Sequence, residues 1–331
     1  MLLAAAASAQ IATTTSLVGT VTDSTGQSMA GAKVTAIETG TLDTHVTKTS
    51  DQGYYSIEFI RVGTYNITAE REGFQKVTKT GVVVEINQVV RADIALSVGA
   101  VNQTITVEAD AGVIKTDDAS VSEIITTRNV AELPLNGRDP MQLATTTPGV
   151  IAGQKATNGV PPGEDFIGAG TREIQNSLSL DGISIMNNLI TTTPNRPMVE
   201  SISEVEVQTG TYSAQYGAYL GVHINMISKS GQNAIHGAVV EFVRNQIFDA
   251  RPYFLAPAAA KSPLHQNQFG FELDGPIVIP HLYNGKDKTF FMGSYEGLRQ
   301  IRSASQVFTI LTPQMFQGNF SQTPTVVRDP S

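Results

Sequence analysis

Apolar and polar residues alternate with a period of two in many short segments of this chain, which is the pattern of half-buried β-strands. Turns that contain Gly or Asp separate these segments at short intervals. Several short strands at this spacing predict an antiparallel β-sandwich over residues 16–98, in which one face of each strand is buried. The positions expected inside are Tyr55-Ile57-Phe59, Tyr65-Ile67-Ala69 and Val90-Ala92-Ile94-Leu96.

The alternation returns between Glu204 and Arg244. Val205 and Val207 alternate with polar residues in one strand, and His223–Ile227 form a second strand. A Ser-Lys-Ser-Gly-Gln-Asn turn follows, and a third alternating strand starts at Ala238. The pattern therefore predicts strands that follow one another directly in this part of the chain.

Other segments of the second half are less regular. An Asp181-Gly182 pair between apolar residues predicts a tight hairpin turn. Residues 152–176 are rich in Gly, Pro and Asn, and we expect them to form a loop. Further strands are expected at residues 268–279 and 288–299.

Composition narrows the class of protein. Charged residues make up 16% and aromatic residues 7% of the 331 residues, which favours strands joined by turns over helical bundles. The net charge of −8 comes without a basic cluster, so we expect no nucleic-acid partner, because phosphate binding needs clustered Lys and Arg. The chain has no cysteine and therefore neither a disulfide framework nor a thiolate metal site.

The first residues resemble the end of a secretory signal. Residues 1–9 contain a short apolar stretch, and Ala7-Ser8-Ala9 forms a small-x-small cleavage site before Gln10. The basic residues that normally precede such a stretch are missing. We expect residues 1–9 to be the remnant of a signal peptide; the alternative is an Ala-rich start without a targeting role.

The sequence offers no set of residues that would carry catalysis. Nucleophile-elbow, phosphate-loop and zinc-ligand spacings are all absent, so we expect no enzyme activity, no cofactor and no metal. Asp23 and Asp51 lie in hairpin turns, where a lone Asp is far more often a turn former than a calcium ligand. The histidines are scattered without a pair at ligand spacing: His45, His223, His236, His265 and His281.

Several motifs resemble one family in the same order along the chain. The segments GTVTDSTGQSMAGAKVTA (19–36), TSDQGYYSI (49–57) and GTYNITAEREGF (63–74) resemble the carboxypeptidase-regulatory-like domain, a non-catalytic accessory module. VEVQTGTYSAQYG (205–217), INMISKSG (224–231) and HGAVVEFVRN (236–245) resemble the junction of plug and barrel in TonB-dependent outer-membrane transporters. Together with LPLNGRD (133–139) and TPGV (147–150), they are similar to the Oar-like receptors.

The resemblance implies a mainly β protein in three parts. Residues 16–98 would be an Ig-like or prealbumin-like β-sandwich, residues 111–232 an α+β plug domain, and residues 233–331 the first strands of an outer-membrane β-barrel. We therefore expect the chain to be a fragment that lacks the rest of the barrel. His223 departs from the family, which carries a small or β-branched residue at that position.

The resemblance also implies a function. The protein would be a receptor in the outer membrane of a Gram-negative-type bacterium, in contact with outer-membrane lipid, with its N-terminal domain in the periplasm. It would bind an unknown extracellular ligand, such as a carbohydrate or a siderophore, and import it with energy from a TonB-type periplasmic transducer. The alternative is a secreted or surface adhesive β protein without transport activity.

One segment is a candidate for binding that transducer. Residues 99–110 connect the sandwich to the plug and contain a β-prone run: Thr104, Ile105, Thr106, Val107, Glu108 and Ala109. The run resembles a TonB box, the peptide with which such receptors pair with the transducer. Pairing would occur by strand addition, in which main-chain hydrogen bonds supply the affinity. The alternative is that Thr104–Glu108 is simply the last strand of the sandwich.

Overall fold

The structure is a computed structural model, and its secondary structure is mainly β. The residues that it describes are 15–99, 104–108, 120–133, 135, 138–153, 166–168, 170–172, 175–186, 196–212, 216–217, 219–251, 253, 255, 260–303 and 310–321. The signal-peptide remnant expected at residues 1–9 therefore lies outside the described residues, as does Ala109.

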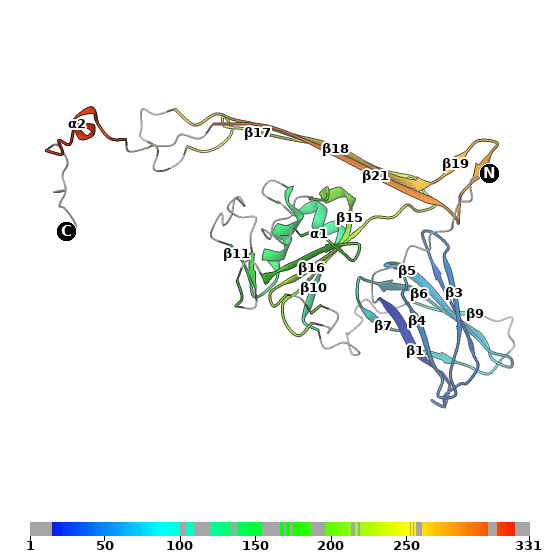
Figure 1. The fold of residues 1–331 in the computed structure, drawn as a ribbon. Coiled ribbons are helices and arrows are strands. Elements are labelled where there is room, and N and C mark those ends of the chain that lie inside the picture. The colour runs from blue at the N-terminus through cyan, green and yellow to red at the C-terminus, as the bar shows by residue number, and fades with distance from the viewer. Residues whose placement is uncertain are drawn as a thin grey trace, which may run out of the picture. The chain divides into compact units, whose positions relative to one another are not determined.

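Residues 15–98, together with residues 104–108, form a β-sandwich (Figure 1). In its first sheet, β1 (Ser16–Asp23) pairs with β4 (Tyr54–Glu58), β7 (Val89–Arg91) and β8 (Ile94–Leu96). The second sheet runs in the order β3-β2-β5-β6-β9. These strands are β3 (Thr44–Lys48), β2 (Lys33–Glu38), β5 (Gly63–Glu70), β6 (Lys76–Val84) and β9 (Thr104–Glu108). One apolar core includes residues from both sheets.

The core of the sandwich follows the predicted alternation, with one exception. Both Tyr65-Ile67-Ala69 and Val90-Ala92-Ile94-Leu96 are buried, as are Tyr55 and Ile57. Phe59 was expected beside them, but its side chain is 57% exposed. The strand ends at Glu58, and Phe59 adopts a φ of 57°, which turns the side chain away from the face that Ile57 shares.

The sandwich is mixed and not purely antiparallel as the sequence suggested. β7 and β8 both run parallel to β1, and β9 runs parallel to β6, whereas the hairpin-connected strands are antiparallel. Strand direction depends on the connections between strands, which period-two patterns do not encode.

Gly19 marks a close approach in the first sheet, because a Cβ there would lie 2.2 Å from the carbonyl oxygen of Ala92.

Residues 120–228 form a second region, here called the middle domain. Its five-stranded sheet has the order β10-β15-β16-β13-β14. Its strands are β10 (Ser122–Thr126), β15 (Ile202–Gln208), β16 (His223–Ser228), β13 (Ser177–Leu180) and β14 (Ile183–Ser184). Helix α1 (Thr127–Glu132) and the 3-10 helices η2 (Pro140–Thr146) and η4 (Val199–Ser201) contribute to its apolar core. The predicted Asp181-Gly182 turn joins β13 to β14, and both residues have positive φ.

The expected loop at residues 152–176 contains regular structure. β11 (Val150–Ala152) pairs antiparallel with β12 (Phe166–Gly168), and Phe166 is buried in the core of the middle domain. The sequence did not reveal β12, because a three-residue strand is too short to show a period. The expectation of an unstructured loop is wrong at Phe166–Gly168.

Three long strands follow, here called the C-terminal sheet. They are β17 (His236–Asn245), β18 (Leu264–Pro276) and β21 (Phe290–Arg302), in the order β17-β18-β21 (Figure 1). A hairpin of β19 (Val278–Ile279) and β20 (Tyr283–Asn284) follows β18. A short helix, α2 (Pro313–Phe316), lies near the end of the described chain.

Candidate functional site

The predicted partner-binding segment forms β9 in the structure. Its residues run parallel to β6, with Lys76 opposite Thr104, Thr78 opposite Thr106 and Thr80 opposite Glu108. β9 is the last strand in the order of its sheet, so among the described residues no strand pairs with its outer edge (Figure 1). Thr104–Glu108 thus belongs to the sheet of the sandwich in this structure and also offers main-chain groups for one more strand.

Side chains contribute little to the attachment of β9. Ile105 is 40% exposed and Val107 is 46% exposed, and Thr106 and Glu108 are exposed as well. Val77, which lies opposite Ile105, is buried in the sandwich core, but neither Ile105 nor Val107 belongs to that core. The main-chain ladder along β6 is therefore the principal contact that holds β9.

A buried polar network lies in the middle domain, on the central strands β15 and β16. The side-chain amide of Asn225 donates to Oε2 of Glu206 at 3.1 Å, and that of Gln208 donates to Oε1 of Glu206 at 2.8 Å. Ser179 Oγ donates to Oδ1 of Asn225 at 2.6 Å. Each of these bonds satisfies a group that would otherwise be costly to bury. The network ties β13, β15 and β16 together through side chains.

His223 begins β16 and is also buried. Its ring lies between two tyrosines, with centroids 4.3 Å from Tyr212 and 5.1 Å from Tyr216. Nε2 lies 3.3 Å from the carbonyl oxygen of Tyr219, while Nδ1 has no hydrogen-bond partner among the described residues. Burial lowers the pKa of His223, because the charged ring would be desolvated. Packing between rings explains how this position accepts a large side chain.

Sequence reasoning missed this network. The alternation in β15 placed Val205 and Val207 on the buried face and Glu206 and Gln208 on the opposite, polar face. In the structure both faces are buried. The signal that could have revealed the network is the second run of polar residues in β16, since two polar faces on adjacent strands can satisfy each other.

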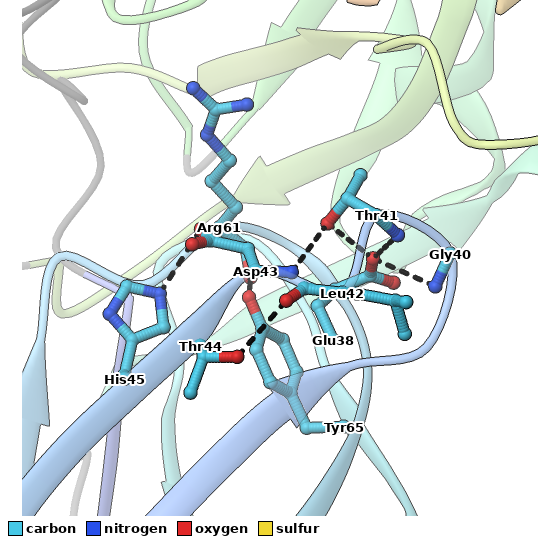
Figure 2. A network of polar contacts seen from close by, with 9 residues as sticks. All are labelled: Glu38, Gly40, Thr41, Leu42, Asp43, Thr44, His45, Arg61 and Tyr65. Carbon is cyan, nitrogen blue, oxygen red and sulfur yellow. Dashed lines mark hydrogen bonds and ion pairs between the residues drawn. The ribbon is translucent and has the colours of Figure 1, made fainter. Parts of the chain in front are cut away.

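The sandwich carries a further polar network, in the loop between β2 and β3. Figure 2 shows that the Glu38 side chain points into its own loop, where Oε2 accepts hydrogen bonds from the main chain of Gly40 and from both the main chain and hydroxyl of Thr41. Asp43 pairs with His45 at 3.3 Å, and Tyr65 donates to the carbonyl of Arg61 at 3.0 Å. The contacts of Glu38 shape the turn around Leu42, whose φ is 61°, and the bond from Tyr65 joins β5 to the segment before it, so we assign these contacts a structural role.

The acidic turn residue Asp23 behaves as a turn former too. Its Oδ1 accepts hydrogen bonds from the main chain and hydroxyl of Thr25 and from the main chain of Gln27. These bonds lower the pKa of Asp23, led by the hydroxyl of Thr25. Among the described residues, no group of three or more His, Cys, Asp or Glu side chains could hold a metal ion.

Strand β18 shows burial opposite to that of a strand in a water-soluble domain. Phe271 and Leu273 are 49% and 43% exposed, whereas Glu272 and Asp274 are 3% and 5% exposed. Lys229 lies 3.6 Å from the carboxylate of Glu272. Phe271 also stacks on Tyr295 of β21, which is itself exposed. Apolar side chains outside and polar side chains inside are the arrangement of a strand whose outer face meets lipid.

Among the residues that the structure describes, no helix has the length and apolar character needed to cross a membrane.

Comparisons with known proteins fit this arrangement. Residues 16–97 match the sequence profile of the carboxypeptidase regulatory-like domain, and residues 227–331 match that of the outer membrane beta barrel domain. With its mainly β fold, the chain is similar to outer-membrane proteins of the TonB-dependent receptor class. It is, more narrowly, a homologue of the Oar-like TonB-dependent transporters.

That relative is the TonB-dependent transporter Oar of Myxococcus xanthus. The two sequences are 24% identical over 305 residues, which is 87% of this chain and 27% of the relative. The chain thus spans about a quarter of the length of the curated relative that it matches.

Solved structures of outer-membrane receptors are similar to part of the chain. The siderophore receptor PirA from Acinetobacter baumannii has 24% identity and a TM-score of 0.37, with 54% of this chain and 24% of that chain covered. The outer membrane transporter YddB from Escherichia coli has 15% identity and a TM-score of 0.39, with 47% and 24% covered. Because both TM-scores are low, the assignment rests on the sequence relative and the family profiles.

Proposed function

We propose that this chain acts in a receptor that binds an extracellular ligand and imports it with energy from a TonB-type transducer in the periplasm. The observation that carries the proposal is the likeness to the transporter Oar over 87% of the chain. An exposed edge strand between two folded domains and a C-terminal sheet with apolar residues outside support it. In such a receptor the edge strand would bind the transducer, and the C-terminal sheet would face lipid.

The proposal assigns a role to each part of the chain. Residues 16–98 are a carboxypeptidase-regulatory-like sandwich that lies in the periplasm, and residues 99–110 are a linker that carries the transducer-binding strand. Residues 111–232 are the plug, which transmits the pull of the transducer, and residues 233–331 supply strands of the lipid-facing barrel. The homology and the inverted burial of β18 support this division.

The transducer would bind Thr104–Ala109 by strand addition. Such binding uses main-chain hydrogen bonds and needs an extended segment with a free edge. β9 is extended, the side chains of residues 105–108 are exposed, and as an edge strand it pairs with β6 alone among the described residues. Ala109 lies outside the described residues, so the structural support covers Thr104–Glu108.

Removal of the strand tests this assignment. We expect a variant of the 331-residue chain without residues 104–108 to lose binding to the purified periplasmic domain of the host's TonB-type transducer, measured by calorimetry. The matched control is Val46→Pro in β3, the edge strand at the opposite end of the same sheet. Equal binding by the deletion variant and the wild type would place the partner site elsewhere.

Transport itself requires a test in the cell. We expect a strain that lacks the full gene to lose uptake of one ligand, with ⁵⁵Fe-loaded siderophores and single carbohydrates as the two classes of probe. Deletion of the transducer gene should cause the same loss. A protein that is released to the medium, and whose deletion impairs adhesion but no uptake, would identify the adhesive alternative instead.

A further inference from the structure

The β6–β9 ladder is the one extensive contact of the candidate strand among the described residues. Five consecutive residues of β9 lie in register with five of β6, from Lys76–Thr104 to Thr80–Glu108. The ladder is parallel, and parallel pairing is slightly weaker per residue than antiparallel pairing. Residues 97–103 separate β9 from β8 along the chain, and of these Ser97 and Gly99 hydrogen-bond to Gln75 and Gly73 beside the start of β6.

β3, at the opposite edge of the same sheet, differs from β9. It is joined to β2 by a short turn whose main chain is bound by Glu38. Its exposed residues are therefore held by a closed hairpin, whereas the ladder along β6 is the main contact of β9 among the described residues. An edge strand with few apolar contacts and solvent-exposed ladder bonds belongs to the part of a fold that opens first.

The position of β9 between the sandwich and the middle domain means that its release from β6 changes which part of the chain bears a pull on it. Beyond Glu108 the chain continues through residues 109–119 to β10 of the middle domain. A partner that pulls on β9 while it is paired with β6 loads the sandwich. A partner that pulls on β9 after its release loads only the chain on either side of it, which includes the segment that leads to the middle domain.

We propose that the edge of β6 stores the transducer-binding strand, and that β6 and the transducer compete for the same main-chain groups of Thr104–Glu108. This inference rests on the proposed function and adds its regulation: the receptor engages the transducer only after β9 leaves the sandwich. The apparent affinity for the transducer is then the intrinsic affinity multiplied by the fraction of molecules in which β9 is released.

A disulfide between β6 and β9 tests the competition. Thr78 and Thr106 are register partners, and neighbouring strands lie at about the Cα separation that a disulfide requires. The chain has no other cysteine, so Thr78→Cys/Thr106→Cys forms a single defined bond. The matched control is Thr35→Cys/Val46→Cys, which joins the register partners of β2 and β3 at the opposite edge.

Two measurements on the 331-residue chain decide the proposal. In the reduced variant, the amides of residues 104–108 should exchange with solvent faster than those of Tyr65–Ala69 in β5, and oxidation should slow them. Oxidation should also weaken binding of the transducer's periplasmic domain by about tenfold or more, while oxidation of the control pair leaves binding unchanged.

The outcomes separate this inference from the proposed function. Exchange at residues 104–108 as slow as in β5 would overturn storage by a releasable strand. Equal binding by the oxidised and reduced forms would also overturn it, because the partner would then use the outer edge of β9 or another segment. If the exchange is fast but neither form binds the transducer domain, the proposed partner site itself is wrong.

Discussion

Tyr55 shows how one side chain joins the strands of the sandwich. It is buried, and its hydroxyl donates to the carbonyl oxygen of Ala92 at 2.6 Å. Burial raises the pKa of Tyr55, which keeps the hydroxyl protonated and able to donate. The bond connects β4 to the segment between β7 and β8, across the first sheet.

Tyr55→Phe should therefore destabilise the sandwich. The substitution keeps the ring but removes the donor, and a buried carbonyl left without its partner costs about 1–3 kcal/mol. For a domain of this size, that corresponds to a drop in melting temperature of roughly 4–8 °C per kcal/mol. The measurement is thermal unfolding of residues 15–110 followed by circular dichroism. Tyr54→Phe, at the exposed neighbouring position, should leave the melting temperature unchanged; an equal drop in both would contradict the role of the bond.

His223 predicts a pH dependence of the middle domain. Its pKa in the folded chain is lowered by burial from the ordinary value of 6.5, so the unfolded chain binds the proton more readily. Stability from the neutral ring is therefore fully present above pH 6.5 and is lost as the pH falls from 6.5 toward the folded pKa. His223→Gln removes the titrating group.

The measurement is the difference in melting temperature between the wild-type 331-residue chain and His223→Gln at pH 7.5 and at pH 5.5. We expect the wild type to lose stability relative to the variant at the lower pH. His45→Gln is the control, because that histidine lies in β3 of the sandwich, outside the middle domain, beside Asp43. A wild-type advantage that grows at pH 5.5 would show that the ring is protonated inside the fold.

At the level of single residues, the sequence predicted the buried faces well and the polar interior poorly. Alternation identified Tyr65, Ile67 and Ala69 correctly, because each strand there has one covered face. It failed at Phe59, where a positive φ ends the strand, and at Glu206, whose strand is covered on both faces. The alternation of apolar and polar residues reveals neither where the backbone turns nor whether the polar face of a strand is also buried.

Among the elements, β9 gains and loses comparable amounts of free energy when it pairs. A ladder hydrogen bond contributes roughly 0.5–1.5 kcal/mol net, while ordering the backbone of one residue costs about 1–2 kcal/mol. Ile105 and Val107 remain nearly half exposed and add only part of their burial energy. The strand is thus close to balance between its paired and released states.

Ile105→Pro should separate the two roles of β9. Proline removes a main-chain donor and cannot sit within a paired strand, so we expect loss of energised uptake in the full-length receptor, with membrane assembly and ligand binding intact. The melting temperature of residues 15–110 should change little, because β9 contributes little to the core. Ile67→Pro, inside β5, is the control that should abolish folding. A large drop in melting temperature for Ile105→Pro, or unimpaired uptake, would remove Thr104–Ala109 from the mechanism.

The candidate site was predictable from the sequence only as a segment. The run Thr104–Glu108 indicated a strand, and it is one, but both of its proposed uses require the same extended backbone. The sequence could not show which strand pairs with this segment. The parallel pairing with β6 depends on the connection between the two strands, which local patterns do not describe. In the storage that we propose, the two alternatives are two states of one strand.

For the molecule as a whole, the contrast is between two ways of covering apolar surface. The sandwich and the middle domain each bury an apolar core of their own. Strand β18 instead buries Glu272 and Asp274 and exposes Phe271 and Leu273. Contiguous exposed apolar residues of this kind mark a surface that is covered by another molecule or by lipid.

This contrast predicts different behaviour in water for two lengths of the chain. Residues 1–230, which include the sandwich and the middle domain, should remain monomeric without detergent, whereas residues 1–331 should associate until detergent covers the C-terminal sheet. Light scattering with and without detergent above its critical micelle concentration is the measurement.

Phe271→Ser/Leu273→Ser should reduce the association of the longer chain, because it removes exposed apolar area from β18. Thr35→Ser/Thr47→Ser, in the sandwich, is the control and should have no effect. A monodisperse 331-residue chain in plain buffer would contradict the lipid-facing role of β18, since nothing would then need to cover Phe271 and Leu273.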